Sequence, residues 1–170
     1  METKTYLFRP DKKFFKQGYI LLDENESVVY EAKMTKFTFF TPFKFQFINN
    51  ITNHEEEHKV GHTITLEESG VAGFFSTKSS FKFDGKNIWD YLHEIGIRIE
   101  SNISKKILGM SYTISLKGNE IATISNTNPS GKKLVVLNKV CYEIKTTEEN
   151  LGLAFLIAFA FARTEQIVYD

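Results

Sequence analysis

The residues with the clearest potential for catalysis lie in one short polar segment. His54, Glu55 and His58 form the pattern His-Glu-x-x-His, and His62 follows four positions later. On a helix this spacing brings two histidines to one face, where they bind zinc while the glutamate activates a water molecule. The pattern alone therefore allows a metal-dependent hydrolase, or a simpler metal site at the three histidines.

The surroundings of this pattern favour a different interpretation. The longer zinc-protease pattern needs its third histidine at position 64, which is Ile64, and residues 50–63 contain only Ile51 and Val60 as large aliphatic side chains. A zinc-binding helix must bury an apolar face against its protein, and this segment has none. We therefore interpret it as a solvated hairpin tip, with the hydrolase as a less favoured alternative and no metal expected.

Lysines form the second group of candidate functional residues. They alternate with aromatic residues along expected strands, so they are predicted to face outward. The residues concerned are Lys36, Lys44, Lys78, Lys82 and Lys86. If they adjoin, they attract anionic phospholipid headgroups, at roughly 1 kcal/mol for each lysine near a charged membrane. The alternative is that they only keep the sheet soluble and protect its edges.

Other kinds of chemistry have little support in the sequence. There is no Gly-x-Ser-x-Gly elbow and no glycine-rich phosphate loop, and Asp23–Glu26 has the composition of a turn rather than the spacing of a calcium loop. The formal net charge is zero, which argues against a nucleic-acid partner because such binding depends on neutralising phosphates. We predict a non-enzymatic binding protein without a cofactor, whose partner is a phospholipid surface or another protein.

These candidate sites must be positioned by the elements around them, and one stretch near the end dominates the chain. Leu151–Ala162 contains no polar side chain. Thr146 and Glu149 match a capping box, and Arg163 suits a helix C-terminus, so the sequence predicts a helix over about 147–163. Because the helix is apolar on every side, it must be enclosed either by lipid or by protein.

Length favours protein as the enclosure. Twelve residues at about 1.5 Å each span about 18 Å, whereas the hydrocarbon of a bilayer is roughly 30 Å thick. A membrane-tethered protein using residues 151–162 remains an alternative. A sheet encloses a helix on all sides by curling, so the sequence predicts a closed antiparallel barrel around a central C-terminal helix.

The remaining chain supplies the strands for such a sheet. Tyr19–Leu22 and Val28–Tyr30 predict a hairpin, and Phe37–Phe47 alternates aromatic with polar residues. Asn87 is expected to cap a short helix near 87–95, with Ile88, Trp89, Leu92 and Ile95 as its buried stripe. The predicted fold is mainly β with a minor α component, in a single domain over 1–170.

Composition adds predictions about the compartment. The single cysteine, Cys141, excludes an intrachain disulfide and fits a reducing compartment. The first residues lack the apolar core of a signal peptide. The expected location is the cytoplasm, with a peripheral position at the inner membrane face if the lysines bind lipid.

A chain of about a dozen strands that ends in a wholly apolar helix resembles the tubby C-terminal-domain-like superfamily. That group includes tubby domains, LURP-one-related proteins, phospholipid scramblases and small bacterial proteins. The resemblance runs from about Tyr6 to Ala162, and its most specific parts are Glu148–Ala162, the hairpin Tyr19–Lys33 and the strand Phe37–Phe47. It implies a twelve-stranded barrel threaded by the C-terminal helix.

The same resemblance suggests a class of ligand. Tubby domains bind phosphoinositides through basic surface residues, although their site has no residue-by-residue match here. The cysteine-rich segment and calcium motif of the scramblases are absent from this sequence. The small bacterial members, which are most similar, imply no particular activity.

Overall fold

The structure is a computed structural model of the 170-residue chain. It describes residues 2–11, 18–36, 44–51, 63–68, 79–83, 86–103, 110–126 and 141–169. Several predicted features lie outside the described residues, among them the His54–His62 segment, Lys78 and the whole of Phe37–Phe43.

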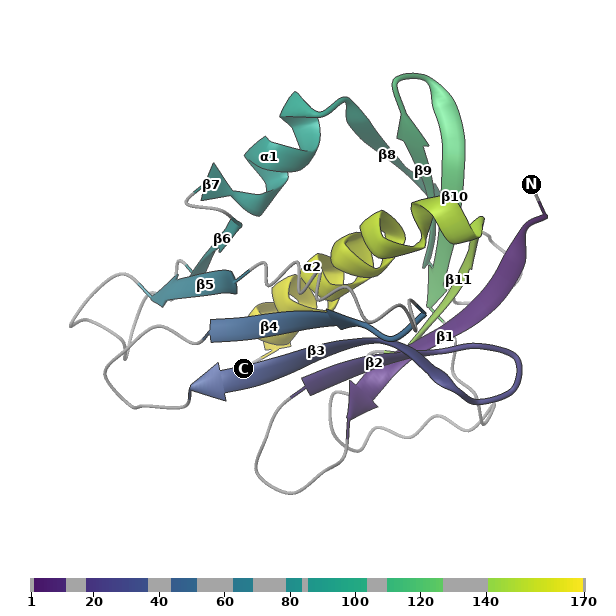
Figure 1. Cartoon of the computed structure of the whole chain (residues 1–170). Coiled ribbons are helices and arrows are strands. Elements are labelled where there is room, and N and C mark those ends of the chain that lie inside the picture. Colours follow the sequence, from purple (N-terminus) through teal and green to yellow (C-terminus); the bar gives the residue numbers. More distant parts are fainter. Residues whose placement is uncertain are drawn as a thin grey trace.

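The described chain contains two runs of strands, and each run is followed by a helix (Figure 1). The first run is β1 (Lys4–Asp11), β2 (Gly18–Leu22), β3 (Val28–Lys36), β4 (Lys44–Asn49), β5 (Thr63–Glu68), β6 (Ser79–Phe83) and β7 (Lys86–Asn87), followed by α1 (Ile88–Glu94). The second run is β8 (Ile97–Ile103), β9 (Met110–Leu116), β10 (Asn119–Asn126) and β11 (Tyr142–Thr146), followed by the 3₁₀ turn η1 (Glu148–Asn150) and α2 (Leu151–Tyr169).

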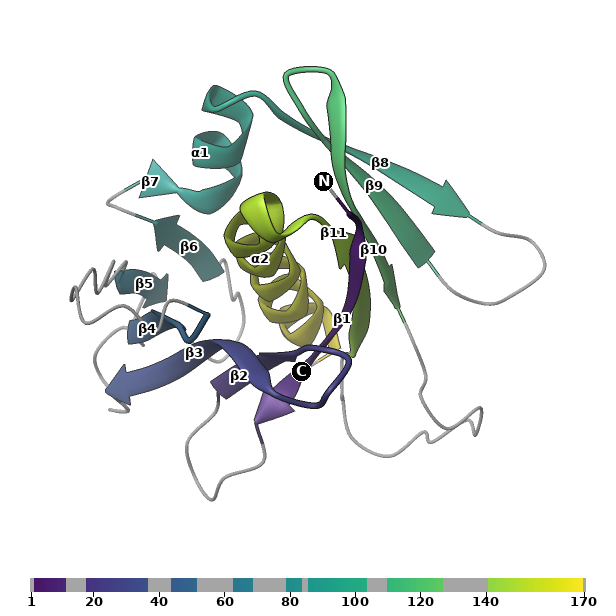
Figure 2. The ribbon, with the colours of Figure 1, turned by 45° about the vertical axis from the view of Figure 1, so that its right-hand side comes forward.

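All eleven described strands belong to one antiparallel sheet. Within each run every strand pairs with its neighbour in sequence, and the two runs join where β1 pairs with β11. The order is therefore β7-β6-β5-β4-β3-β2-β1-β11-β10-β9-β8. Figure 2 shows this sheet curling around α2, which lies on its concave side.

The predicted closed barrel of about twelve strands needs correction. The described sheet has eleven strands, and no described pairing joins its edge strands β7 and β8. The chain leaves the sheet after only two residues of β7, because the Asn87 side chain accepts a hydrogen bond from the Trp89 backbone N–H at 2.9 Å and starts α1. The chain from β7 to β8 is thus a helix, packed on β6 and β8. A further strand expected at Leu134–Leu137 lies outside the described residues.

The short helix α1 confirms its prediction. Asn87 caps it, and Gly96 follows it with φ of 92°, a left-handed conformation that suits glycine. Ile88 and Leu92 are buried, while Trp89 and Ile95 are half-buried against the same core. The expected apolar stripe therefore faces the interior.

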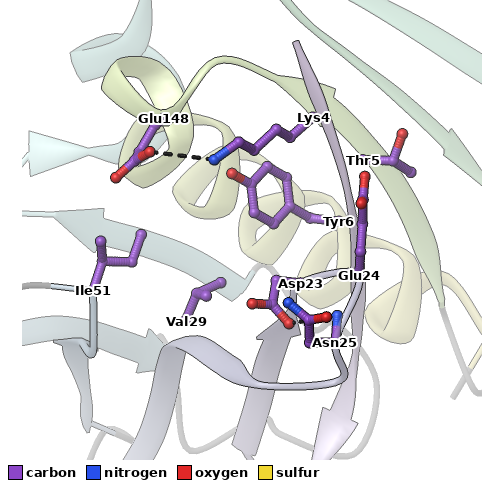
Figure 3. A pocket seen from close by; sticks show the side chains of 9 residues that line it. All are labelled: Lys4, Thr5, Tyr6, Asp23, Glu24, Asn25, Val29, Ile51 and Glu148. Atoms are coloured by element: carbon purple, nitrogen blue, oxygen red, sulfur yellow. Dashed lines mark hydrogen bonds and ion pairs between the residues drawn. The ribbon is translucent and has the colours of Figure 1, made fainter. Parts of the chain in front are cut away.

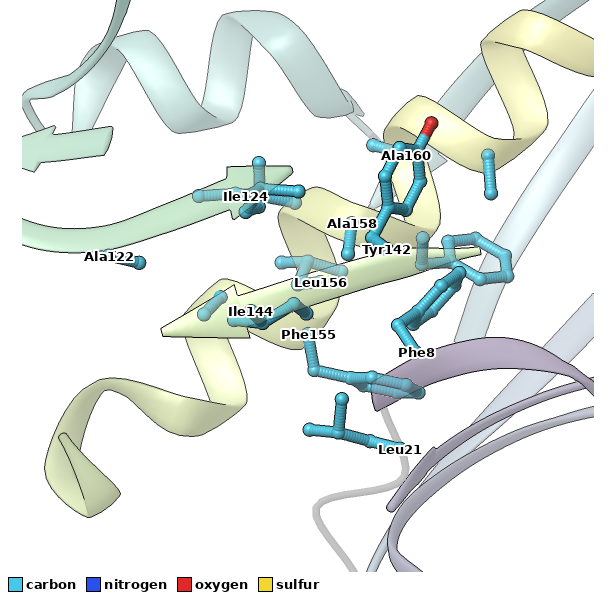
Figure 4. Packing of buried hydrophobic residues seen from close by; sticks show 14 of the residues in the cluster. Phe8, Leu21, Ala122, Ile124, Tyr142, Ile144, Phe155, Leu156, Ala158 and Ala160 are labelled. Carbon is cyan, nitrogen blue, oxygen red and sulfur yellow. The ribbon is translucent and has the colours of Figure 1, made fainter. Parts of the chain in front are cut away.

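The prediction of an enclosed apolar helix is also confirmed. Within Leu151–Ala162 nine side chains are buried and the other three, Gly152, Leu153 and Phe161, are half-buried. Figure 4 shows part of this packing, in which α2 lies against strands from both runs. None of the described helices is long and apolar enough to cross a membrane.

Both ends of this helix differ from the prediction. Thr146 is not a cap: it is the last residue of β11, and its hydroxyl donates to the Ile121 carbonyl of β10 at 2.7 Å. Thr147 precedes the 3₁₀ turn instead, without a capping hydrogen bond from its side chain. At the other end α2 continues past Arg163 to Tyr169.

Aromatic rings fill the space between the helix and the sheet. The fully buried Phe159 ring has its centroid 5.0 Å from that of Phe45, 5.1 Å from Phe47 and 5.4 Å from Tyr19. One turn earlier, Phe155 lies 5.6 Å from Phe8. Edge-to-face contacts of this kind add to the burial energy of the rings. The aromatic face predicted for the Phe45 and Phe47 strand therefore contacts α2.

Candidate functional site

A pocket of about 250 Å³ opens where the sheet meets the start of α2 (Figure 3). Its wall comes from the beginning of β1, the β2–β3 turn with the start of β3, the chain just after β4, and η1. The lining residues are Lys4, Thr5, Tyr6, Asp23, Glu24, Asn25, Val29, Ile51 and Glu148. It combines three carboxylates and one ammonium group with apolar side chains.

Asp23 has a structural role at this pocket. Its Oδ1 accepts hydrogen bonds from the backbone N–H groups of Asn25 at 2.9 Å and Ser27 at 2.8 Å. A short aspartate that bonds the chain two residues on is a common way to form a turn. The segment Asp23–Glu26 is accordingly the turn predicted from its composition, closed further by the hydrogen bond from Asp23 N–H to the Ser27 carbonyl at 3.0 Å.

Tyr6 forms the inner wall of the pocket. The residue is only 5% exposed, and its hydroxyl points toward the Lys4 and Glu148 side chains (Figure 3). Burial raises the pKa of this hydroxyl; Lys4 lowers it in part, and Glu148 and the turn carboxylates raise it further. The phenol is therefore protonated at neutral pH and is available both to donate and to accept a hydrogen bond.

A loose ion pair crosses the mouth of the pocket. The Lys4 Nζ lies 3.5 Å from the Glu148 Oε2, and about half of each side chain is exposed. Exposed pairs at such distances contribute little to stability. Glu148 can therefore leave Lys4 for another cation at little cost in stability.

The predicted lysine sites lie elsewhere, on the sheet. In the strand register Lys36 of β3 is opposite Lys44 of β4, Lys44 is opposite Thr65 of β5, and Thr65 is opposite Lys82 of β6. Residues directly opposite each other in antiparallel strands share a face of the sheet. Lys36, Lys44 and Lys82 thus occupy one row across four strands, which we call the lysine row.

The lysine row is defined by the strand register alone, which shifts between Met34 and Lys36 of β3. The neighbouring row contains Phe45, which is fully buried against α2, and successive residues of a strand alternate between faces. Lys33 is opposite Gln46, one row from Phe45 on the side away from the lysine row, and it is exposed. Its Nζ pairs with the Glu31 Oε2 at 2.8 Å. Sequence reasoning missed Lys33, although it alternates with the buried Ala32.

Lys86 differs in position from the lysine row. The β6–β7 turn places it opposite Phe83, whereas Lys82 is opposite Asn87. The grouping of Lys82 with Lys86 rested on both having even numbers, but the two lysines lie in adjacent rows of the β6–β7 pair. The exposed Lys86 ammonium lies 2.6 Å from the Glu94 carboxylate of α1.

No metal centre is found in the part of the chain that the structure describes, where no three His, Cys, Asp or Glu residues are grouped to hold an ion. The residues proposed for a zinc site, His54, Glu55, His58 and His62, lie outside that part. Cys141 is half-buried just before β11.

The pocket itself was not predicted from the sequence. Its residues come from four segments, and each had an ordinary local explanation as a strand, a turn or a helix start. The signal available was the pair Lys4 and Glu148, at opposite ends of the chain, which approach only because β1 pairs with β11.

Comparison of the chain with protein-family models, with curated proteins and with solved structures finds no match. The resemblance to the tubby-like superfamily therefore stays a prediction.

Proposed function

We propose that the protein is a non-enzymatic module that binds anionic phospholipid headgroups at a membrane surface through the lysine row. The observation that supports this proposal is the register that aligns the positions of Lys36, Lys44 and Lys82 in one row across neighbouring strands. Neighbouring strands are about 4.8 Å apart, so Lys36 and Lys44 are about 5 Å apart and Lys82 is about 10 Å from Lys44. These spacings suit the headgroups of adjacent lipids.

Charge repulsion within the row supports the same proposal. Lys36 and Lys44 are directly opposite each other, and like charges in that position destabilise a strand pair. An anionic headgroup that binds between them removes this cost. Binding is thereby favoured by relief of repulsion as well as by direct attraction.

The cellular setting follows from the ligand. Anionic lipids are concentrated in the cytoplasmic leaflet, where basic surface residues bind them. We place the protein in the cytoplasm with reversible attachment to the inner membrane face, as in the tubby domains it resembles. It would act there by binding rather than by catalysis.

The first experiment is flotation of the purified full chain with neutral vesicles and with vesicles that contain phosphatidylserine. Binding to the anionic vesicles alone is expected, with loss of binding between about 0.1 M and about 1 M salt, because the screening length falls from about 10 Å to about 3 Å. Equal binding to both vesicle types, or binding that is insensitive to salt, would contradict the proposal.

Variants separate the lysine row from general surface charge. Lys44→Gln and Lys82→Gln are each expected to weaken vesicle binding by about fivefold, the equivalent of about 1 kcal/mol per lysine. Lys117→Gln, in the exposed β9–β10 turn, is the matched control for the lost charge. Lys86→Gln is a second control, because Lys86 lies outside the row and already pairs with Glu94.

A gain of binding provides the converse test. Glu67 lies two positions beyond Thr65 in β5 and therefore on the same face as the lysine row. Glu67→Gln removes a repulsive charge and is expected to strengthen binding to phosphatidylserine vesicles. If the full chain does not float under any condition, membrane binding is excluded and a protein partner becomes the leading hypothesis.

A further inference from the structure

The pocket at the start of α2 has features of a binding site that is separate from the lysine row. Its volume of about 250 Å³ equals the space of about eight water molecules, at about 30 Å³ each. Three carboxylates, from Asp23, Glu24 and Glu148, share the lining with the single ammonium group of Lys4. The excess of negative charge favours a cationic occupant.

Tyr6 gives the pocket a polar group for a ligand, independently of the carboxylates. The residue is 95% buried, since only 5% of it is exposed, and its hydroxyl points into the pocket (Figure 3). No hydrogen-bond partner for this hydroxyl is found among the described residues. The hydroxyl oxygen is not one of the polar atoms that are both buried and unpartnered, so solvent reaches it from the pocket, and a ligand N–H group can replace that solvent. Since burial raises its pKa, the phenol stays neutral and can accept such a bond.

The Lys4 ammonium shows which chemical group fits. It lies at the pocket mouth, 3.5 Å from the Glu148 carboxylate, while both side chains remain about half exposed. An ammonium group of the protein thus already uses part of the site. The pair is long and solvated, so a free amine is able to replace Lys4 beside Glu148.

The rest of the wall defines the remainder of the ligand. Val29 and Ile51 face the acidic groups across the pocket and offer an apolar surface for a short alkyl chain (Figure 3). A bare metal ion does not match this lining, and the described acidic residues are not grouped to hold one. The occupant should therefore carry both a positive charge and carbon.

From these features we propose that the pocket binds a small alkylammonium compound, with its ammonium group between Glu148 and the Tyr6 hydroxyl and its alkyl chain against Val29 and Ile51. Lys4 competes with this ligand for Glu148. The site acts independently of the lysine row, since the two lie on different parts of the sheet and select opposite charges.

The experiment is a titration of the ¹⁵N-labelled full chain with n-butylammonium, followed by the amide signals of Tyr6, Val29, Ile51 and Glu148. Saturable shifts confined to the pocket are expected. n-Butanol and butyrate, which have similar size but no positive charge, serve as matched probes and are expected to give no saturable shifts. Equal shifts with all three compounds, or none with n-butylammonium, would overturn the proposal.

The Lys4→Met variant, compared with a control variant that loses the same charge elsewhere, makes the sharpest test. If Lys4 competes with the ligand, only Lys4→Met changes the affinity, whereas a general effect of net charge changes the affinity of both variants. Removing the competing ammonium should tighten n-butylammonium binding by about twofold to fivefold, the size of an exposed ion pair. Lys145→Met loses the same charge from an exposed pair with Glu143 on β11 and is expected to leave the affinity unchanged. If both variants bound n-butylammonium more tightly by the same factor, the cause would be the change in net charge, and competition by Lys4 would be refuted.

Two further variants address the ammonium contacts. Glu148→Gln is expected to weaken binding by at least about threefold, whereas Glu143→Gln is the control without effect. Tyr6→Phe retains the ring in the core and removes only the hydroxyl, so it is expected to weaken binding by about twofold to tenfold. Unchanged affinity in both Glu148→Gln and Tyr6→Phe would contradict the assigned geometry. Asp23 is left intact, because its carboxylate forms the turn.

Discussion

Two tyrosines, Tyr6 and Tyr30, have hydroxyl groups close to the first turns that lead into α2. Burial raises the pKa of each hydroxyl above its ordinary value of about 10. Below about pH 9 both groups are protonated in the folded and the unfolded chain, so they add no pH dependence. At higher pH the unfolded chain loses these protons first, and the free energy of unfolding falls as the pH rises.

This linkage predicts a specific alkaline sensitivity. Between about pH 9 and about pH 11 the free energy of unfolding of the native sequence is expected to fall more steeply than that of a Tyr6→Phe, Tyr30→Phe double variant. Urea unfolding at several pH values measures both slopes. At neutral pH the two proteins should share one pH dependence. Parallel slopes above pH 10 as well would show that neither hydroxyl is shielded from water.

At the scale of elements, the contact between β3 and α2 depends on the absence of one side chain. A Cβ at Gly152 would lie 3.0 Å from the Tyr30 hydroxyl oxygen and 3.5 Å from its Cζ. The Tyr30 ring packs on Phe155 at 5.5 Å, which restricts how far it can move aside. Glycine therefore allows the first turn of the helix to approach the strand.

The contact makes the effect of Gly152→Ala depend on Tyr30. Alanine in a helix is favoured over glycine by about 0.5–1 kcal/mol. In the native sequence the short contact with the hydroxyl is expected to cancel or reverse this gain. In a Tyr30→Phe background the nearest contact becomes ordinary van der Waals distance, and Gly152→Ala is expected to stabilise the protein. Urea unfolding of the four proteins gives the coupling energy, and additive effects would contradict this account.

The elements also show which predictions local sequence permits. The buried helix, the short α1 and the first hairpin were predicted correctly, because apolar periodicity, the cap at Asn87 and the polar turn at Asp23 are local signals. The prediction that Thr146 caps the helix was wrong, because a contact with a distant part of the chain decides the role of this residue. Its hydroxyl bonds to the Ile121 carbonyl of a neighbouring strand, which no spacing within the helix segment reveals. The end of α2 was placed too early, since Arg163 looked like a terminal residue but the helix continues to Tyr169.

For the whole molecule, the sequence indicated what must be enclosed but not how the sheet ends. An all-apolar helix demands a curved cover, which the structure provides. Closure depends on the two edge strands, and the chain places α1 between them instead of a strand pair. The pocket escaped prediction for a related reason. Its lining unites β1 with η1, a neighbour relation created by the pairing of the first strand with the last one described.

The central helix comes after every strand of the sheet in sequence, and this order has a consequence for folding. Nine buried side chains between Leu151 and Ala162 cover the concave face, where Phe8, Phe45 and Tyr142 are fully buried. A chain that ends at Asn150 retains the strand sequences but loses the partner of that apolar face. An open sheet with one uncovered apolar face has little to offset the entropy of ordering its strands.

We therefore expect the 1–150 fragment to lack a cooperative unfolding transition and to bind a hydrophobic dye such as ANS, as loosely packed chains do. Phe159→Ala in the full chain is the graded control: it removes one ring that contacts Tyr19, Phe45 and Phe47. The free energy of unfolding of that variant is expected to be about 3–5 kcal/mol lower than that of the native sequence. The variant should still unfold in one step if the native protein is stable enough to tolerate this loss. Thermal unfolding by circular dichroism measures both. A cooperative transition in the fragment would show that the sheet is stable by itself and that α2 fills it only afterwards.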